Sequence, residues 1–299
     1  MSRSGGLTRA CAPVVMLAVA ACTAVATSTA GPARAQAGQV TPSTPGTAVQ
    51  ALPHYAHVVV VVMENHTAGE VIGTAPYITS LARQGADFTR SYAVTHPSQP
   101  NYLALFSGST HGVTSDTCPL TFSAPNLGAD LLAHGQTFAG YSEGLPATGS
   151  TTCTQGNYAR KHVPWTDFSN VPASVSKPFA AWPAHNFGSL PAVSFVIPNL
   201  CDDMHNCPVA TGDAWLKKNL SSYVAWAATH NSLLIVTWDE DDRSGPNLIP
   251  TIIVGQHVRP GSYRTQISHY SVLRTIEDLF RLPHDGAAAS ARPITTIWR

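Results

Sequence analysis

A serine in the segment 95–108 stands in a setting that could make it a nucleophile. The segment reads Thr-His-Pro-Ser-Gln-Pro-Asn-Tyr-Leu-Ala-Leu-Phe-Ser-Gly. Pro100 suits the first turn of a helix, and Ser98 suits the cap before it. The Ser98 hydroxyl would then lie at the positive end of the helix, among free backbone N–H groups, which favours an alkoxide and an incoming phosphate. Most Ser-x-Pro sequences taken alone are simply helix caps, so a catalytic role for Ser98 needs support from elsewhere in the chain.

Polar side chains follow three apolar runs, at the point where each run ends. The runs are residues 57–63, 192–197 and 233–238, and the polar segments after them are 64–66, 198–205 and 239–242. Continuous apolar runs rich in β-branched residues are typical of strands buried on both faces of a parallel sheet. The carboxyl ends of parallel strands meet at one edge of a sheet, so we expect the polar segments to lie close together.

Helical stretches separate these strands. Residues 213–228 and 271–280 have helical patterns, and a fourth apolar run, 251–254, ends at Gly255. Strands that alternate with helices predict an α/β fold with a mostly parallel central sheet flanked by helices on both faces.

Four segments, taken together and in their order along the chain, resemble a known family. Ser98-x-Pro-Asn-Tyr, followed by Ser107-Gly108 and His111-Gly112, is similar to the nucleophile helix of nucleotide pyrophosphatases and phospholipases C. The other three segments are residues 63–67 (Met-Glu-Asn-His-Thr), 238–242 (Trp-Asp-Glu-Asp-Asp) and 269–278. The set resembles the phosphoesterase family of bacterial and fungal acid phosphatases and phospholipases C, in the alkaline-phosphatase-like superfamily. The matches run from about residue 57 to residue 282, and we expect one catalytic domain over residues 54–299 with the alkaline-phosphatase-like fold.

The resemblance implies a hydrolase of phosphoric esters whose nucleophile is Ser98. The implied metal ligands are Glu64, Asn65, Ser98, Asp239 and Glu240. His205 and His269 are implied as catalytic side chains, and Asn101, His162 and Asp202 as substrate-binding ones. Oxygen ligands suit hard cations such as Ca²⁺, Mg²⁺ or Mn²⁺, and histidines favour zinc or iron, so one or two divalent ions of open identity are expected.

Two of these assignments keep an alternative. Asp202 and Asp203 are adjacent, so their side chains should point in opposite directions, and we expect Asp202 to face the site. The pair Lys161-His162 either binds phosphate, as similar pairs do in the family, or consists of two surface residues in a loop.

The implied mechanism passes through a phosphoserine. A serine hydroxyl is a poor nucleophile, and contact with a metal ion would lower its pKa. We expect an acid phosphatase that hydrolyses small phosphomonoesters, with a phospholipase C or another phosphodiesterase as the alternative.

Rival functions fit fewer residues. Residues 140–144 read Gly-Tyr-Ser-Glu-Gly and match the G-x-S-x-G esterase pattern, but that motif needs a helix directly after the serine, and residues 145–150 read as a loop. A sulfatase would need Arg where Tyr102 stands. A non-catalytic binding protein would not need Ser98, Glu64 and Asp239 together, so a serine esterase acting through Ser142 and a binding protein are remote alternatives.

The N-terminal part of the chain has features of an exported protein. Residues 1–35 have the basic, apolar and small-residue regions of a signal peptide, and residues 36–53 are typical of a flexible linker. Cys22 follows Val-Ala-Ala, so a lipid anchor at this residue is the alternative to simple secretion. We expect no transmembrane segment in the mature chain. Four cysteines remain outside the leader, which indicates disulfides, and four cysteines allow three pairings.

The overall charge excludes one class of partner. The formal net charge is zero and only 11% of the residues are charged, so the chain lacks the basic footprint of a nucleic-acid-binding protein. The expected partner is a small phosphorylated substrate, and the sequence makes no prediction of the oligomeric state.

Overall fold

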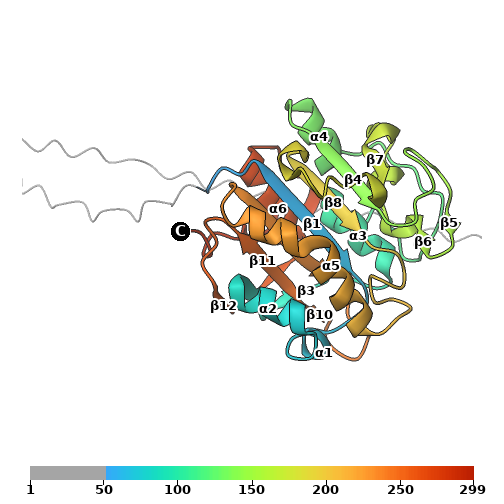
Figure 1. Cartoon of the computed structure of the whole chain (residues 1–299). Coiled ribbons are helices and arrows are strands. Elements are labelled where there is room, and N and C mark those ends of the chain that lie inside the picture. The colour runs from blue at the N-terminus through green and yellow to red at the C-terminus, as the bar shows by residue number, and fades with distance from the viewer. Residues whose placement is uncertain (1–51) are drawn as a thin grey trace, which may run out of the picture. The chain divides into compact units, whose positions relative to one another are not determined.

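An eight-stranded mixed sheet forms the centre of residues 52–299, the part of the chain that the computed structural model describes (Figure 1). Across the sheet the strands are β12 (Gly261–Tyr263), β2 (Ala86–Phe88), β11 (Thr251–Gly255), β9 (Ser232–Trp238), β1 (His57–Met63), β8 (Val193–Ile197), β4 (Phe138–Ser142) and β7 (Ser176–Pro178). The strands from β9 to β7 are parallel, and β11 runs antiparallel to β9 and β2. The predicted strands and the mostly parallel sheet are therefore confirmed.

Strand β1 shows why this sheet is buried on both faces. Its sequence is His-Val-Val-Val-Val-Val-Met, and Val58 to Met63 are at most 1% exposed. Because side chains alternate along a strand, Val58, Val60 and Val62 belong to one hydrophobic cluster and the residues between them to another.

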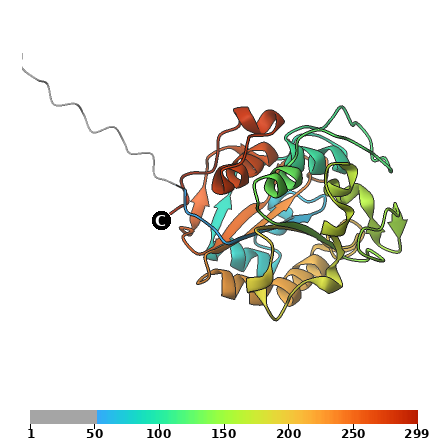
Figure 2. The same ribbon diagram turned by 90° about the horizontal axis from the view of Figure 1, so that it is seen from above.

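Helices cover both faces, as Figure 2 shows from above. The helices are α1 (Ala68–Val71), α2 (Pro76–Gln84), α3 (Ser98–Ser107), α4 (Leu127–Ala133), α5 (Val209–Ala227) and α6 (His269–Phe280). Buried residues of α3, α4 and α6 share one cluster, and those of α2 and α5 share the other. The expected helices 213–228 and 271–280 correspond to α5 and α6, which begin four and two residues earlier in the chain.

Short elements complete the domain. Two small sheets contain β3 (Ser91–Tyr92), β10 (Leu248–Ile249) and β13 (Ile267–Ser268), and β5 (Thr154–Gln155) and β6 (Tyr158–Ala159). The 3₁₀ helices are η1 (Arg160–His162), η2 (Pro164–Asp167), η3 (Ala173–Val175), η4 (Phe179–Ala181), η5 (Phe187–Ser189) and η6 (Gly286–Ser290).

All four cysteines of the described residues form disulfides, Cys118–Cys153 and Cys201–Cys207. The predicted disulfides are confirmed, and of the three possible pairings the chain adopts the one that closes the shorter loops. Within residues 52–299, no helix is long and apolar enough to cross a membrane. The expected signal peptide, Cys22 and nearly all of the expected linker lie outside the described residues.

Candidate active site

The Ser98 hydroxyl lies at the start of α3, against the end of β1. Ser98 is the first residue of the helix and is 2% exposed, and its Oγ donates to Glu64 Oε2 at 3.1 Å. Pro97, not Ser98, occupies the cap position, so the expectation that Ser98 caps α3 is wrong. The hydroxyl is directed at a carboxylate 34 positions earlier in the chain instead of at its own helix.

Three buried carboxylates gather at this edge of the sheet, which brings Glu64 after β1 together with Asp203 after β8 and Asp239 after β9. None of the three is more than 1% exposed. Backbone hydrogen bonds hold the strand ends in register, because Glu64 N donates to Asp203 O at 2.9 Å and Asp239 N donates to Met63 O at 3.0 Å. The prediction that polar segments after the parallel strands converge is confirmed for these residues.

Burial controls how this cluster ionises. Burial raises the pKa of Glu64 well above its ordinary value, and the neighbouring charges of Asp239 and Asp203 raise it further. Burial also raises the pKa values of Asp239 and Asp203 to about 8. Three such carboxyl groups ionise together only when positive charge is brought to them, so the cluster holds protons or a cation.

The cluster offers the donor set of a hard divalent cation. The Asn65 side-chain amide lies between Glu64 and Asp239. When its NH₂ group is turned toward them, that group is 3.0 Å from Glu64 Oε2 and 3.2 Å from Asp239 Oδ1. With its carbonyl oxygen turned toward them, the amide would add a third oxygen ligand. Glu64, Asn65, Asp239 and the Ser98 hydroxyl therefore fit a cation such as Ca²⁺, Mg²⁺ or Mn²⁺.

A second donor set shares Glu64. Single ligand atoms of Glu64, His162 and Asp203 all lie within 4.8 Å of one another, so these three buried residues could also bind a metal ion. His162 Nε2 is 3.3 Å from Glu64 Oε1, and its Nδ1 is 3.6 Å from Asp203 Oδ2. Burial lowers the pKa of His162 well below its ordinary value, so the ring is neutral and has a lone pair to offer. The surface-loop alternative is therefore wrong for His162, which is 1% exposed.

Asp203, and not the expected Asp202, faces this cluster. Asp202 is half-buried on the other side of the turn, where its Oδ2 accepts from Asn199 Nδ2 at 2.7 Å and its carboxyl group contacts Glu143. The two neighbours point apart as the sequence predicted, but the choice between them was wrong. Which of the two aspartates faces the cluster depends on the backbone conformation of the turn after β8, and the residue types in the sequence do not predict that conformation.

Asn101 is also used differently from the expectation that it binds substrate. Its Oδ1 accepts from the backbone N–H groups of Val94 and Thr95, both at 3.0 Å. Its Nδ2 donates to the carbonyl groups of Thr95 and Pro97 at 2.8 and 3.1 Å. Because an amide makes about four hydrogen bonds, no group remains for a substrate. Asn101 thus holds the loop that delivers Ser98.

The two expected catalytic histidines lie in different environments. His269 is buried, its Nε2 donates to the Asp239 carbonyl at 2.7 Å, and its Nδ1 has no hydrogen-bond partner among the described residues. Burial lowers the pKa of His269 to about 4, so this ring is neutral. His205 is exposed, with its ring centroid 6.0 Å from that of His162, so it lies at the rim of the cluster.

Two residues of the site were missed by the sequence analysis. Tyr102 donates its hydroxyl to Glu64 Oε1, and its ring stacks on that of His162 with centroids 4.9 Å apart. His96 bonds Glu240 Oε2 through Nδ1 at 2.6 Å, so the expected metal ligand Glu240, which adjoins Asp239, has a side-chain partner of its own. Both belong to the segment of Ser98, and that proximity is the signal that could have found them.

The rival serine lies outside any catalytic arrangement. Ser142 is fully buried at the end of β4, its Oγ has no partner among the described residues, and the next helical element is η1, which begins at Arg160. Gly140 has a packing reason, because a Cβ atom there would come within 2.1 Å of the Trp165 ring. The G-x-S-x-G pattern is therefore not a nucleophile turn.

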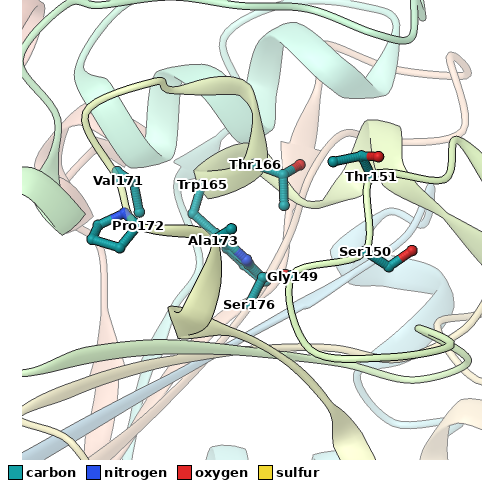
Figure 3. A pocket seen from close by; sticks show the side chains of 9 residues that line it. All are labelled: Gly149, Ser150, Thr151, Trp165, Thr166, Val171, Pro172, Ala173 and Ser176. Carbon is teal, nitrogen blue, oxygen red and sulfur yellow. The ribbon is translucent and has the colours of Figure 1, made fainter.

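The pocket drawn in Figure 3 is not a catalytic candidate. It has a volume of about 70 Å³ and lies between residues 149–151 and residues 165–176. None of its nine lining residues has an acidic or basic side chain. This pocket therefore lacks the acidic and basic groups that acid–base or metal chemistry needs, whereas the cluster around Ser98 and Glu64 has them.

The chain is similar to known proteins in sequence and in structure. The profile of the Phosphoesterase family matches residues 73–283. A protein of Mycobacterium tuberculosis named phosphatidylinositol-3-phosphatase is 57% identical over 257 residues, which cover 85% of this chain and 86% of that protein. A phosphate-repressible acid phosphatase of Penicillium chrysogenum is 29% identical over 227 residues, 70% of this chain and 55% of its own length. Among solved structures, an alkaline phosphatase superfamily protein of Vibrio parahaemolyticus superposes with a TM-score of 0.57 at 13% identity, covering 81% of this chain and 71% of that one, and supports the fold alone.

Proposed function

The chain belongs to the Phosphoesterase family and hydrolyses phosphoric ester bonds, and from this we propose that it is an exported, metal-dependent phosphomonoesterase with Ser98 as its nucleophile. The observation that carries the proposal is the Ser98 hydroxyl, buried at the start of a helix and bonded to Glu64 within a cluster of carboxylates. The relatives named above are both phosphatases, which favours a monoester substrate over the phospholipase C alternative. The name of the mycobacterial relative adds phosphorylated inositol lipids to the substrates that deserve testing.

The proposed reaction has two steps. A divalent cation held by Glu64, Asn65 and Asp239 would lower the pKa of a serine hydroxyl and offset charge on the phosphoryl oxygens. Ser98 passes its hydroxyl proton to Glu64, which accepts its hydrogen bond, and Oγ attacks phosphorus while the bond from phosphorus to the leaving oxygen breaks and that oxygen takes a proton from the general acid. Water then attacks the phosphorus of the phosphoserine and gives a proton to the same acid–base group, the bond from phosphorus to Oγ breaks, and Ser98 takes its proton back from Glu64 as phosphate leaves.

The environments of the histidines support His205 as the acid. A general acid must hold a proton to give and must reach the leaving group. His269 has a pKa of about 4 and is buried against Asp239, so it rarely carries a proton to give. His205 is exposed at the rim, where a leaving group would emerge. The proposal assigns the proton to His205 and a positioning or metal-binding role to His269.

Export is supported by the disulfides. Cys118–Cys153 and Cys201–Cys207 would not persist in a reducing cytosol. Both therefore agree with the expected signal peptide and a location outside the cytoplasm.

The test compares Ser98→Ala with Ser142→Ala as the control. Ser98→Ala should lower turnover of p-nitrophenyl phosphate by several orders of magnitude with an unchanged melting temperature, because the hydroxyl caps no helix. Ser142→Ala should keep turnover. A rapid acid quench of the wild type should trap phosphate on the peptide that contains Ser98. Near-normal activity of Ser98→Ala would refute the proposal, and no trapped phosphate would refute the covalent step.

The substrate class and metal need their own measurements. The panel is p-nitrophenyl phosphate, its bis ester, phosphatidylcholine vesicles and vesicles that carry phosphatidylinositol 3-phosphate, with metal content measured on the same sample. Turnover of the monoesters alone supports the proposal, and faster turnover of the bis ester or phosphatidylcholine would favour the alternative. Full activity in a sample verified as metal-free would end the metal-dependent mechanism.

A further inference from the structure

An aspartate outside the carboxylate cluster occupies the anion-binding groups beside Ser98. Asp116 Oδ1 accepts from the backbone N–H of Gln99, the second residue of α3, at 3.1 Å. Asp116 Oδ2 accepts from Lys161 Nζ at 2.6 Å. One carboxylate thus bridges the start of the nucleophile helix and a lysine.

The two residues that follow Asp116 are fixed in place. The Gln99 side chain accepts from Thr117 N at 2.6 Å and donates to Asp167 at 3.2 Å, which fastens the loop to the start of α3. The next residue, Cys118, is joined to Cys153. The backbone that follows Asp116 is therefore anchored, so the carboxylate would leave its two donors by rotation of the Asp116 side chain.

The two donors are the groups that a phosphoryl group on its way to Ser98 would use. The backbone N–H at a helix start attracts anions through the helix dipole, and it lies one residue from the nucleophile. Lys161 lies close enough to the cluster for its charge to offset part of the rise that burial causes in the pKa values of Glu64 and Asp203. A phosphoryl oxygen at Ser98 therefore competes with a carboxylate for the same two donors.

We propose that Asp116 is a built-in competing anion that sets the affinity of the site for phosphate. Substrate binding exchanges the Asp116 carboxylate for a phosphoryl group on Lys161 and Gln99 N–H. The exchange costs a charge-assisted hydrogen bond, which weakens the binding of substrate and of the product phosphate alike. Faster release of product is the benefit that such a residue brings.

The surroundings allow the carboxylate to leave. The Asp116 side chain is 30% exposed, and it borders a hollow of about 190 Å³ whose walls include the Cys118–Cys153 disulfide and Leu200. The Asp116 carboxylate therefore has solvent-accessible space to occupy once phosphate has taken its two donors.

The inference rests on the proposed function, so its test uses phosphate binding as well as turnover. The variant is Asp116→Asn, which keeps the size of the side chain and removes its charge. The control is Asp242→Asn, which removes a charge from an exposed residue whose carboxylate, among residues 52–299, accepts side-chain and backbone hydrogen bonds only from Ser244, two positions later. The dissociation constant of inorganic phosphate is measured by calorimetry on the metal-loaded protein, and its inhibition constant on the turnover of p-nitrophenyl phosphate.

Asp116→Asn should bind phosphate about tenfold more tightly, because the competing charge is gone, and Asp242→Asn should match the wild type. In a Lys161→Met background the gain should shrink, because the lysine is the donor under competition. Unchanged or weaker phosphate binding by Asp116→Asn would overturn the inference and make Asp116 a neutral or a positioning residue. A wild type that binds phosphate but turns over no phosphoester would instead sink the proposed function and leave this comparison intact.

Discussion

The buried carboxylate of Asp203 should strengthen metal binding and destabilise the metal-free protein. Replacement of Asp203 by Asn tests both effects in one variant. Asp203 is fully buried beside His162 and Glu64, and its Oδ2 has no hydrogen-bond partner among the described residues. We expect Asp203→Asn to weaken metal binding and to stabilise the metal-free protein. The matched control is Asp202→Asn, one residue away on the opposite side of the turn, which should change neither property.

The size of the effect on metal binding follows from Coulomb's law. A carboxylate at about 4 Å from a doubly charged ion, in a site with an effective dielectric constant of about 20, interacts with it by about 8 kcal/mol. We expect about half of this to be lost, because the amide of the Asn variant still offers an oxygen to the ion, and about 4 kcal/mol corresponds to about a thousandfold weaker metal binding. Turnover at limiting metal should fall to a similar extent and recover partly when metal is added in excess.

The effect on stability has the opposite sign. The pKa of Asp203 rises from 3.8 to about 8 in the fold, so the stability linked to its protonated form is present below pH 4 and is lost as the pH rises through 8. That rise corresponds to at most about 5 to 6 kcal/mol, of which we expect about 2 kcal/mol because Asp239 shares the proton. Asn cannot ionise, so metal-free Asp203→Asn should melt roughly 4 to 8 °C higher than the wild type at pH 8 and at the same temperature at pH 4.

The assay is calorimetric titration of Mg²⁺, Mn²⁺, Ca²⁺ and Zn²⁺, with thermal melts of the chelated proteins at both pH values. Weaker metal binding by Asp203→Asn, together with its higher melting temperature at pH 8, would show that Asp203 belongs to the metal site. If Asp202→Asn has these effects and Asp203→Asn does not, the orientation of the turn after β8 is wrong. If neither variant changes metal binding, the cation lies elsewhere.

Three further perturbations test other parts of the site and fold. Tyr102→Phe removes the hydroxyl bonded to Glu64 but keeps the stacked ring, so kcat should fall about tenfold with an unchanged melting temperature. An unaltered kcat would show that this hydrogen bond does not position Glu64 for the reaction. Cys201→Ser with Cys207→Ser frees the turn that carries Asp203 and should lower turnover at temperatures where circular dichroism still shows a folded domain; loss of activity only upon unfolding would contradict this. Burial raises the pKa of Asp285 to about 8, so the stability linked to its protonated form should be lost between about pH 4 and pH 8. Asp285→Asn should therefore melt a few degrees higher than the wild type at pH 8 only, and equal melting curves at pH 8 would argue against the raised pKa.

The sequence by itself determined the frame of the site. The valine run of β1 predicts a strand buried on both faces, so Glu64 had to emerge where parallel strands end. The order of the motifs predicted the fold and the family, which the comparisons confirm. These features are local, because burial on both faces and a helix after Pro100 depend on neighbouring residue types.

Only the tertiary structure decided which side chains meet. The Glu64 carboxylate bonds Tyr102, 38 positions away, and Glu240 bonds His96, 144 positions away. No local pattern encodes such pairings, since they depend on how the loops after β1, β8 and β9 pack at one edge of the sheet. The choice of Asp203 over Asp202 has the same origin, because a shift of one residue in a turn reverses the direction of a side chain. Asn101 was misassigned because its type fits both substrate binding and loop bracing, and only the backbone around residues 94–97 shows that its amide is fully used.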